Sequence, residues 1–600
     1  MSSDFEVKEY EFNTEVLKNI NPKYINWPVV YLINNNNKIY IGETSNIKSR
    51  MKQHLDNPDR KFLKLINIIF DKKFNKSAIL DIEQNLIRMF YADTRFNSDS
   101  GILNKNNGQS SKHNYYQREM YLNKLADIWK KLQQKRLVNN PYNSIINSDI
   151  YKYSPFISLT NEQEDIMCKI INNILDCLEG KSTNETSIIT GLAGTGKTIL
   201  AINLIYNIVN ADFSNIDTFE DNEIEILSEF DKTMHRLRKY ILCNGKIKIG
   251  FVVPMTSLRE TLNVVFKAIN KKKLKNIVIA PGDVTKENYD VIICDEAHRL
   301  AQYKNIANMG HFKKKCKELG IDENTSTQLD WINMKSKYKV LFYDGNQTIK
   351  GSDIQTDKMD DLIQKNSDKC YSLTTQLRCK SGELFLENID KLFKCTLKNK
   401  IESSKDFEIK VFNNPNEMIE KIKHLDKEMG LCRNVAGYDW EWKSKGKSNE
   451  EIRKRDLYDF DFDGKKYIWN HTNKAWILSN NAVNEIGCVH TVQGYDLNYV
   501  GVIIGPDLSY NKEKNKIEVH ISKLKDSNVK RGTDEKIVQK YIINTYKILL
   551  ERGIKGCYIY ACDGSMQEYL KEHIENDNSN IEYAKGWIYS LLCYMKILYC

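Results

Sequence analysis

One eight-residue segment limits what this 600-residue chain can fold into more than any other. Residues 191–198, GLAGTGKT, fit the pattern G-x-x-x-x-G-K-[ST] and lie between an apolar strand, SIIT, and an apolar helical segment, ILAINLIYNIV. A strand, a glycine-rich loop and a helix in that order predict a loop whose backbone amides enclose phosphates. The predicted nucleotide-binding residues are Gly191, Gly194, Gly196, Lys197, which reaches the outer phosphates, and Thr198, which binds Mg²⁺.

A carboxylate pair follows a second apolar strand, VIIC. Asp295 and Glu296 come directly after it, where the carboxyl ends of parallel strands form sites in α/β proteins. We expect Asp295 to hold Mg²⁺ through water and Glu296 to polarise the water that attacks ATP. Further apolar runs, among them KIGFVV, KVLFYD, YVGVIIG and CYIYAC, alternate with helical segments. They predict parallel strands buried on both faces, hence an α/β fold from about residue 156 onward.

Several short segments resemble, in their order, the motifs of superfamily 1 helicases. LTNEQ at 159–163 resembles the element whose glutamine, here Gln163, binds adenine, and FYDGNQTI brings Asp344 and Gln347 to the element that senses the γ-phosphate. Arg378 and Arg552 match two arginines that contact phosphates from the second lobe. The resemblance places nucleic-acid strand contacts at Pro254, Thr256 and Arg259, and a T-x-Q-G element at Thr491, Gln493 and Gly494.

Taken together, residues 156–563 are similar to the Schlafen-like helicase domain of bacterial proteins, over about two thirds of the chain. The resemblance implies two RecA-like lobes that close on ATP and Mg²⁺, with arginines of the second lobe reaching the phosphates held by the first. His298 departs from the glutamine that many superfamily 1 enzymes carry at this position.

A different pattern stands near the N-terminus. Residues 27–54 predict two short strands around an Asn-rich turn and then a helix, with Tyr31 and Tyr40 on the strands and Arg50 and His54 on one helix face. In the helical segment KSAILDIEQNLIRMFY, Glu83 lies near the middle of an apolar stripe. A carboxylate aimed into packed surface is costly unless a metal or a partner satisfies it. Cross-strand packing of the tyrosines and a purely structural ion pair of Glu83 with Arg50 stay open.

These N-terminal segments resemble the GIY-YIG endonuclease family over about 80 residues. Residues 29–31, VVY, stand for the first tripeptide, with Val29 in place of its glycine, and residues 40–42, YIG, for the second. The resemblance implies that Glu83 binds one divalent cation, Mg²⁺ or Mn²⁺. It also assigns Tyr31 as general base, Tyr40 as its support and Arg50 to the phosphate. The later family positions match Arg50, His54, Glu83 and Asn104.

The predicted architecture is a small α+β nuclease domain followed by two RecA-like parallel α/β lobes. Lys and Arg outnumber Asp and Glu by 23 to 15 in the first 140 residues, which places most of the net charge of +10 there. A connector helix with apolar Leu122, Leu125, Trp129 and Leu132 is expected to show a basic face. The predicted parts are an N-terminal extension at 1–24, the nuclease domain at 25–110, the basic connector at 111–150, lobes at 151–365 and 366–573, and a tail at 574–600.

The predicted function is an ATP-dependent helicase or translocase joined to a metal-dependent nuclease. DNA is preferred to RNA as its substrate, and defence against phage is the biological role suggested by analogy. Two alternatives stay open: an RNA-directed helicase-nuclease, and a nucleic-acid-sensing ATPase whose nuclease domain only binds. The N-terminus resembles no signal or transit peptide, and no apolar run reaches the roughly 18 residues of a membrane span. We therefore expect a cytoplasmic protein without a membrane partner; a second copy or a protein partner is left open.

Overall fold

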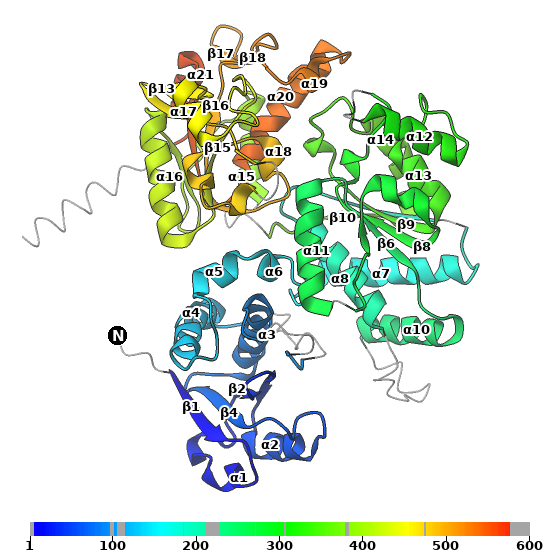
Figure 1. The fold of residues 1–600 in the computed structure, drawn as a ribbon, viewed down its shortest axis with the longest axis vertical. Helices are drawn as coiled ribbons and strands as arrows, with labels where there is room; N and C mark the ends of the chain where they lie inside the picture. Colours follow the sequence, from blue (N-terminus) through cyan, green and yellow to red (C-terminus); the bar gives the residue numbers. More distant parts are fainter. Residues whose placement is uncertain are drawn as a thin grey trace, which may run out of the picture.

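The computed structural model describes residues 5–96, 101–104, 115–183, 185–211, 228–270, 272–304, 306, 308–377, 383–472 and 476–575. Figure 1 shows a small N-terminal part in blue and two larger α/β parts, one cyan to green and one yellow to orange. A short helical segment in cyan lies where the three parts meet. In the described ranges, no helix combines the length and the apolar character needed to cross a membrane.

The N-terminal part is built on a four-stranded antiparallel sheet in the order β1-β4-β2-β3. The predicted pair of strands around a turn and the helix after it are confirmed as β2, β3 and α2. The extension predicted over residues 1–24 is wrong, because all seven residues of β1 pair with β4 and complete the sheet. The elements are β1 (Phe5–Glu11), α1 (Val16–Asn19), β2 (Val29–Asn34), β3 (Ile39–Thr44), α2 (Ile47–Asp56), β4 (Leu65–Asp71) and α3 (Lys76–Ala92).

The predicted connector belongs to this N-terminal body. Helix α4 (Arg118–Gln134) buries Trp129 in one hydrophobic cluster with Phe90 of α3. Two cations that were expected on a basic face are used internally: Lys124 pairs with Asp71, and Lys131 Nζ lies 3.9 Å from the centroid of the Phe5 ring. The basic face is therefore smaller than predicted. Its exposed cations are Lys130, Lys135 and Arg136.

Lobe 1 is a six-stranded parallel sheet in the order β10-β5-β9-β8-β6-β7, with hydrophobic clusters on both faces. The lobe boundary predicted after residue 365 is wrong, because β10 (Cys370–Leu373) pairs with β5 in this sheet. The other strands are β5 (Thr186–Gly191), β6 (Ile249–Val252), β7 (Val278–Ile279), β8 (Tyr289–Cys294) and β9 (Ser336–Tyr343), and the helices are α7 (Asn161–Leu178), α8 (Lys197–Asn210), α10 (Glu229–Asn244), α11 (Thr256–Asn270), α12 (Met309–Leu319), α13 (Gln328–Lys335) and α14 (Thr356–Lys365).

Lobe 2 is a five-stranded parallel sheet in the order β11-β19-β16-β12-β15. Together with lobe 1 it confirms the predicted α/β class, since every strand pair in both sheets is parallel. Its strands are β11 (Glu408–Val411), β12 (Cys432–Ala436), β15 (Ile486–Gly487), β16 (Leu497–Ile504) and β19 (Gly553–Ala561), and its longer helices are α15 (Glu383–Phe393), α16 (Pro415–Met429), α20 (Glu535–Leu550) and α21 (Gly564–His573). Two hairpins, β13 (Phe460–Phe462) with β14 (Lys465–Tyr467) and β17 (Leu508–Asn511) with β18 (Lys516–Val519), extend beyond the sheet.

The segment α5 (Tyr142–Asn147) and α6 (Asp149–Lys152) lies where the three parts of the molecule meet (Figure 1). It packs on α3 and α11, and Asn147 donates to the main-chain oxygen of Met429 in lobe 2 at 2.6 Å. The segment follows α4 and precedes lobe 1, so it lies on the chain path from the N-terminal part to lobe 1. Tyr151 Oη donates to Asn85 of α3 at 3.1 Å, and Thr261 of α11 donates to Asp149 at 3.1 Å. Just after α6, Tyr153 Oη donates to the main-chain oxygen of Gly494 in lobe 2 at 2.5 Å.

Candidate active sites

The phosphate loop connects the end of β5 to the start of α8, as predicted. Gly194 and Gly196 have φ angles of +84° and +81°, a region that residues with side chains rarely adopt. Lys197 is 7% exposed, and its Nζ donates to the main-chain oxygens of Gly191 at 2.7 Å and Leu192 at 3.0 Å. The lysine is therefore folded into the curve of the loop, where the outer phosphates of a nucleotide would bind.

Thr198 and Asp295 come together although they follow different strands. Thr198 Oγ1 donates to Asp295 Oδ2 at 2.6 Å. Asp295 is 1% exposed, and this burial raises the pKa of its carboxyl. A hydroxyl and a carboxylate are hard oxygen donors of the kind that Mg²⁺ takes beside nucleotide phosphates. The residues present therefore fit a magnesium ion at this position.

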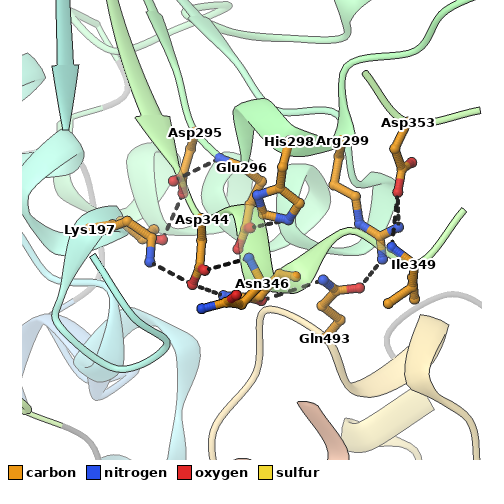
Figure 2. Close-up of polar contacts among 12 residues, drawn as sticks. Lys197, Asp295, Glu296, His298, Arg299, Asp344, Asn346, Ile349, Asp353 and Gln493 are labelled. Carbon is orange, nitrogen blue, oxygen red and sulfur yellow. Dashed lines mark hydrogen bonds and ion pairs between the residues drawn. The ribbon is translucent and has the colours of Figure 1, made fainter. Parts of the chain in front are cut away.

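Glu296 and His298 lie beside that pair (Figure 2). Glu296 has a φ of +52°, which is strained for a residue with a side chain and is typical of positions held for function. Its Oε2 lies 3.1 Å from His298 Nε2, close but without hydrogen-bond alignment. Burial lowers the pKa of His298 to about 4, so its imidazole is neutral at physiological pH.

A chain of polar contacts leads from the phosphate loop into lobe 2, as Figure 2 shows. Lys197 Nζ donates to Asp344 Oδ2 at 3.2 Å, and Gln347 Nε2 donates to the same oxygen at 2.7 Å. Although burial disfavours the charged carboxylate, the Lys197 ammonium and the Gln347 amide hold the pKa of Asp344 below its usual value. Gln493 of lobe 2 then donates to Gln347 Oε1 at 3.4 Å. Four residues predicted from three separate motifs are thus in direct succession.

A cavity of about 310 Å³ opens between the lobes against the end of this chain. Arg299 donates to Gln493 Oε1 and lines the cavity. Lys350 lines it too, and burial together with the Arg299 guanidinium lowers the pKa of its ammonium. Arg299 is paired with Asp353 at 2.9 Å, so Lys350, whose charged form burial disfavours, is the cation of this wall that a polyanion would stabilise. Other lining residues are Asp353 and the predicted strand contacts Pro254 and Thr256.

Gln163 lies against the phosphate loop. It is 1% exposed, closes a capping box with Thr160 at the start of α7, and donates from Nε2 to Thr195 O at 3.0 Å. The predicted adenine-binding glutamine is therefore in place beside the loop but bonded to its main chain. A second cavity of about 310 Å³ lies against the loop and the ends of β5, β9 and β10, within the size range of ligand pockets.

Arg259 and Arg552 do not lie where their predicted contacts with nucleic acid and phosphate require. Arg259 turns toward its own main chain, where Nη1 donates to Val253 O at 2.7 Å. Arg552 is 1% exposed, and its Nε donates to Ile548 O one turn earlier in the chain at 3.0 Å. An enclosed guanidinium does not extend toward phosphates of the first lobe, so this arrangement does not match the expected contact. Arg378 lies outside the described residues.

In the N-terminal domain, Tyr31 lies across the neighbouring strand. It is fully buried on β2 and pairs with Gly42 on β3. A Cβ added to Gly42 would lie 2.3 Å from Tyr31 Oη and 2.4 Å from Tyr31 Cζ. The second tripeptide therefore needs glycine, because a tyrosine ring occupies the space of its side chain.

Tyr31 Oη is the centre of a hydrogen-bonded cluster. His54 Nε2 lies 2.8 Å from it, and Arg50 Nε donates to it at 3.2 Å, both from α2. Arg60, in the loop after α2, places Nη1 2.6 Å from His54 Nδ1 and its guanidinium carbon 3.8 Å from the centroid of the Tyr40 ring. The four predicted side chains of the strands and α2 are thus brought together, with one further arginine that no sequence pattern indicated.

Glu83 lies on α3 and is 8% exposed. Burial and the nearby Glu43 carboxylate raise the pKa of Glu83 to about 8, against the opposite effects of Lys76 and Arg50. Lys76 Nζ lies 2.5 Å from both carboxylate oxygens of Glu43. Arg50 donates to Tyr31 and Gln53 instead of closing the structural ion pair with Glu83 that the sequence left open. A buried carboxyl beside a second carboxylate fits a divalent cation, which stabilises the charged form.

Asn104 has a positioning role. Its Oδ1 accepts from Ile41 N at 3.0 Å, and its Nδ2 donates to Ile41 O at 2.7 Å, so it holds β3 between Tyr40 and Gly42. Glu43 and Lys76 were not predicted. Strand alternation could have found Glu43, which shares a face with Ile41, the face that packs on α3.

Comparisons with known proteins identify two domains in this chain. Residues 184–563 match the Schlafen group 3, DNA/RNA helicase domain, and residues 28–95 match the GIY-YIG catalytic domain. The chain is 26% identical over 457 residues to "Uncharacterized protein YPL245W" of Saccharomyces cerevisiae, covering 69% of this chain and 90% of that protein. Similar solved structures include Pif1 helicase from Bacteroides with ADP-AlF3 and single-stranded DNA, at 12% identity and a TM-score of 0.24, covering 72% of this chain and 97% of that one.

The two matched domains account for the two sites described above. The helicase domain contains the phosphate loop, the Thr198–Asp295 pair and the contacts with lobe 2, and the catalytic domain contains the Tyr31 cluster. The chain is therefore an ATPase/helicase and an endonuclease that uses a nucleotide and divalent metal ions. It belongs to the Schlafen group 3 DNA/RNA helicase domain family, with a GIY-YIG catalytic domain in the same chain.

Proposed function

We propose that this protein uses ATP and Mg²⁺ to move along or unwind DNA, which its N-terminal domain cuts with Mg²⁺ or Mn²⁺. The succession Lys197, Asp344, Gln347 and Gln493 carries this proposal, because it connects the phosphate loop to lobe 2 through direct hydrogen bonds. A γ-phosphate that draws Lys197 away from Asp344 changes the first of these contacts. The change reaches lobe 2 through the hydrogen bond of Gln493 to Gln347, and Gln493 lines the inter-lobe cavity.

In the motor, each residue has a role that follows from its place. Lys197 neutralises the outer phosphates, and Thr198 with Asp295 would hold Mg²⁺, which offsets the charge that develops on the phosphates. Glu296 orients the attacking water. Lys350, beside the Arg299–Asp353 ion pair, supports contact with a nucleic-acid backbone at the inter-lobe cavity.

In the nuclease domain, Tyr31 acts as the general base in its phenolate form: the hydroxyl first releases its own proton to solvent, and Oη then takes the proton of the attacking water. Arg50 stabilises the charge on the phosphate. Glu83 would hold the divalent cation, which supplies Lewis-acid activation of the scissile phosphate. His54 holds the Tyr31 hydroxyl by a hydrogen bond, and the Tyr40 ring packs near the Tyr31 ring. By analogy with other nucleases fused to motors, we propose that the substrate is foreign DNA and that the protein restricts phage.

The test uses the full chain with single-stranded, double-stranded and forked DNA and with RNA of matched sequence, each with and without ATP and Mg²⁺. Glu83→Gln is expected to lose cleavage while keeping ATP hydrolysis, and Lys197→Ala to lose ATP hydrolysis. The matched control is Glu9→Gln, an exposed carboxylate on β1. Cleavage of RNA alone would favour the RNA-directed alternative. Undiminished cleavage by Glu83→Gln would refute the nuclease assignment. Phage plaque counts in cells that express wild-type or Glu83→Gln protein test the biological role.

A further inference from the structure

Arg60 occupies a position beside the nuclease cluster that nothing in the two tripeptide motifs specifies. It lies in the loop after α2, six residues beyond His54. Its guanidinium is held between two members of the cluster, with Nη1 2.6 Å from His54 Nδ1 and its central carbon 3.8 Å from the Tyr40 ring centroid. A charged side chain placed against an aromatic face and a ring nitrogen together has a defined orientation.

The contact with His54 fixes where the imidazole carries its proton. A guanidinium has only N–H donors and stays protonated in proteins, so it must donate to His54 Nδ1. A neutral imidazole that accepts at Nδ1 carries its hydrogen on Nε2. His54 Nε2 therefore donates to Tyr31 Oη, which lies 2.8 Å away. Burial and the charges of Arg60 and Arg50 lower the pKa of His54 to about 3, so the ring is neutral at any physiological pH.

The same reasoning fixes the role of the Tyr31 oxygen. It accepts one hydrogen bond from His54 Nε2 and a second from Arg50 Nε at 3.2 Å. With both acceptor positions filled from α2, the hydroxyl hydrogen of Tyr31 must point away from His54. His54 has no free lone pair facing Tyr31 and cannot take that proton. Burial and Tyr40 raise the pKa of the Tyr31 hydroxyl, and the two N–H donors already in place act in the opposite direction by stabilising a phenolate.

We propose that Arg60 is a positioning residue of the nuclease: it locks His54 in the Nε2–H tautomer, so that His54 supports Tyr31 as a hydrogen-bond donor and never acts as its base. This inference rests on the proposed role of Tyr31. It adds a residue and a direction of hydrogen bonding that the role alone does not specify. Without Arg60, the ring is free to adopt the Nδ1–H tautomer, and Tyr31 would then donate to His54 Nε2 instead of accepting from it.

The experiment reads the tautomer and the cleavage rate in the full chain. Protein labelled with ¹⁵N-histidine reports which ring nitrogen of His54 is protonated, and His54→Gln assigns the signal. We expect Nε2–H in the wild type and loss of that single tautomer in Arg60→Met. The kcat for cleavage should fall about 10- to 100-fold with KM unchanged, as for other residues that orient a ligand or base from behind. Arg60→Lys keeps a donor and should restore most of the rate.

Two controls keep the outcome decisive. Lys61→Met removes an exposed neighbouring cation and should change neither readout. An unchanged circular dichroism spectrum and thermal unfolding curve of Arg60→Met show that its N-terminal domain is folded, because ATP hydrolysis reports only on the other domain. An Nδ1–H signal in the wild type, or an unchanged kcat in Arg60→Met, would overturn the proposal. If the wild-type chain cuts no nucleic acid at all, the proposed function fails, while the tautomer measurement still decides whether Arg60 orients His54.

Discussion

Replacing Gly42 by alanine should disable the nuclease without touching the motor. The added Cβ would lie 2.3 Å from Tyr31 Oη and 2.4 Å from Cζ, whereas ordinary van der Waals contact begins at 3.4 Å. The phenol ring must therefore shift by about 1 Å or the strands must separate. Tyr31 is fully buried and bonded to His54 and Arg50, so the shift also disturbs both of those contacts.

The size of the effect follows from how sharply catalysis depends on position. A misplacement of about 1 Å typically costs about 100-fold in rate. That corresponds to about 2.7 kcal/mol in the barrier, since each 1.36 kcal/mol is a factor of ten. Overpacking of a buried ring adds about 1–3 kcal/mol of lost stability to the N-terminal domain. Cleavage should therefore fall by at least about 100-fold at a temperature where the domain remains folded.

The assay measures cleavage and ATP hydrolysis in the same sample. The ATPase is an internal control, because the phosphate loop lies in a different domain from Gly42. Gly310→Ala is the matched substitution, since a Cβ there meets nothing within 4 Å. A Gly42→Ala protein that cuts at the wild-type rate, with circular dichroism unchanged, would refute the assignment of Tyr31 as a positioned catalytic group.

Three further predictions concern other parts of the molecule. Gln493→Ala breaks the link between lobes and should lower nucleic-acid-stimulated ATPase about 10- to 100-fold, while fluorescent nucleotide still binds. Asp439→Asn concerns a buried pair in lobe 2: burial and the Asp507 carboxylate raise the pKa of Asp439. The wild type is therefore expected to lose stability as pH rises from 7 to 9, and the variant, which mimics the protonated form, should show a smaller fall in Tm. Trp129→Ala removes a fully buried side chain and should destabilise the N-terminal domain by about 3–5 kcal/mol, so that cleavage is lost at a lower temperature than ATP hydrolysis.

Each of these predictions has an outcome that contradicts it. Full stimulation of the Gln493→Ala ATPase would show that the hydrogen bond to Gln347 does not couple the lobes. An identical decline of Tm with pH in Asp439→Asn would place the titrating group elsewhere. Trp129→Ala is compared with Gln134→Ala, at an exposed position of the same helix, and equal thermal inactivation of the two would show that α4 is not part of the nuclease core.

The sequence predicted most of the motor because its site depends on the main chain and on strand order. The glycine-rich loop, Thr198 and Asp295 come together wherever a parallel sheet brings the ends of those strands to one edge. Long side chains are harder to place. Arg259 and Arg552 donate to main-chain oxygens of their own segments instead of reaching a ligand. A sequence motif does not show which of these two partners an arginine takes.

In the nuclease domain, too, some site residues could be predicted from the sequence and others could not. Tyr31, Arg50 and Glu83 follow from strands and helices with clear periodicity, and the structure brings them into one region. Arg60 comes from an irregular loop, whose course depends on tertiary contacts that no local pattern encodes. Two errors had a common cause. The apolar spacing correctly predicted a helix in the connector, but β1 and α4 complete the sheet and the core of the domain through contacts with residues distant in the sequence.

The contacts of α5 and α6 have a consequence for where cuts would fall. A nuclease on a flexible tether samples a wide range of positions around its motor, and its products vary in length. Here the intervening segment is hydrogen-bonded to α3, to α11 and to the Gly494 loop. These bonds hold the nuclease domain and the helicase lobes in one arrangement. The separation between them along a bound strand is then a fixed length. Cuts made while the motor is stalled at a known block should therefore fall at one distance from that block and form a narrow band of product lengths.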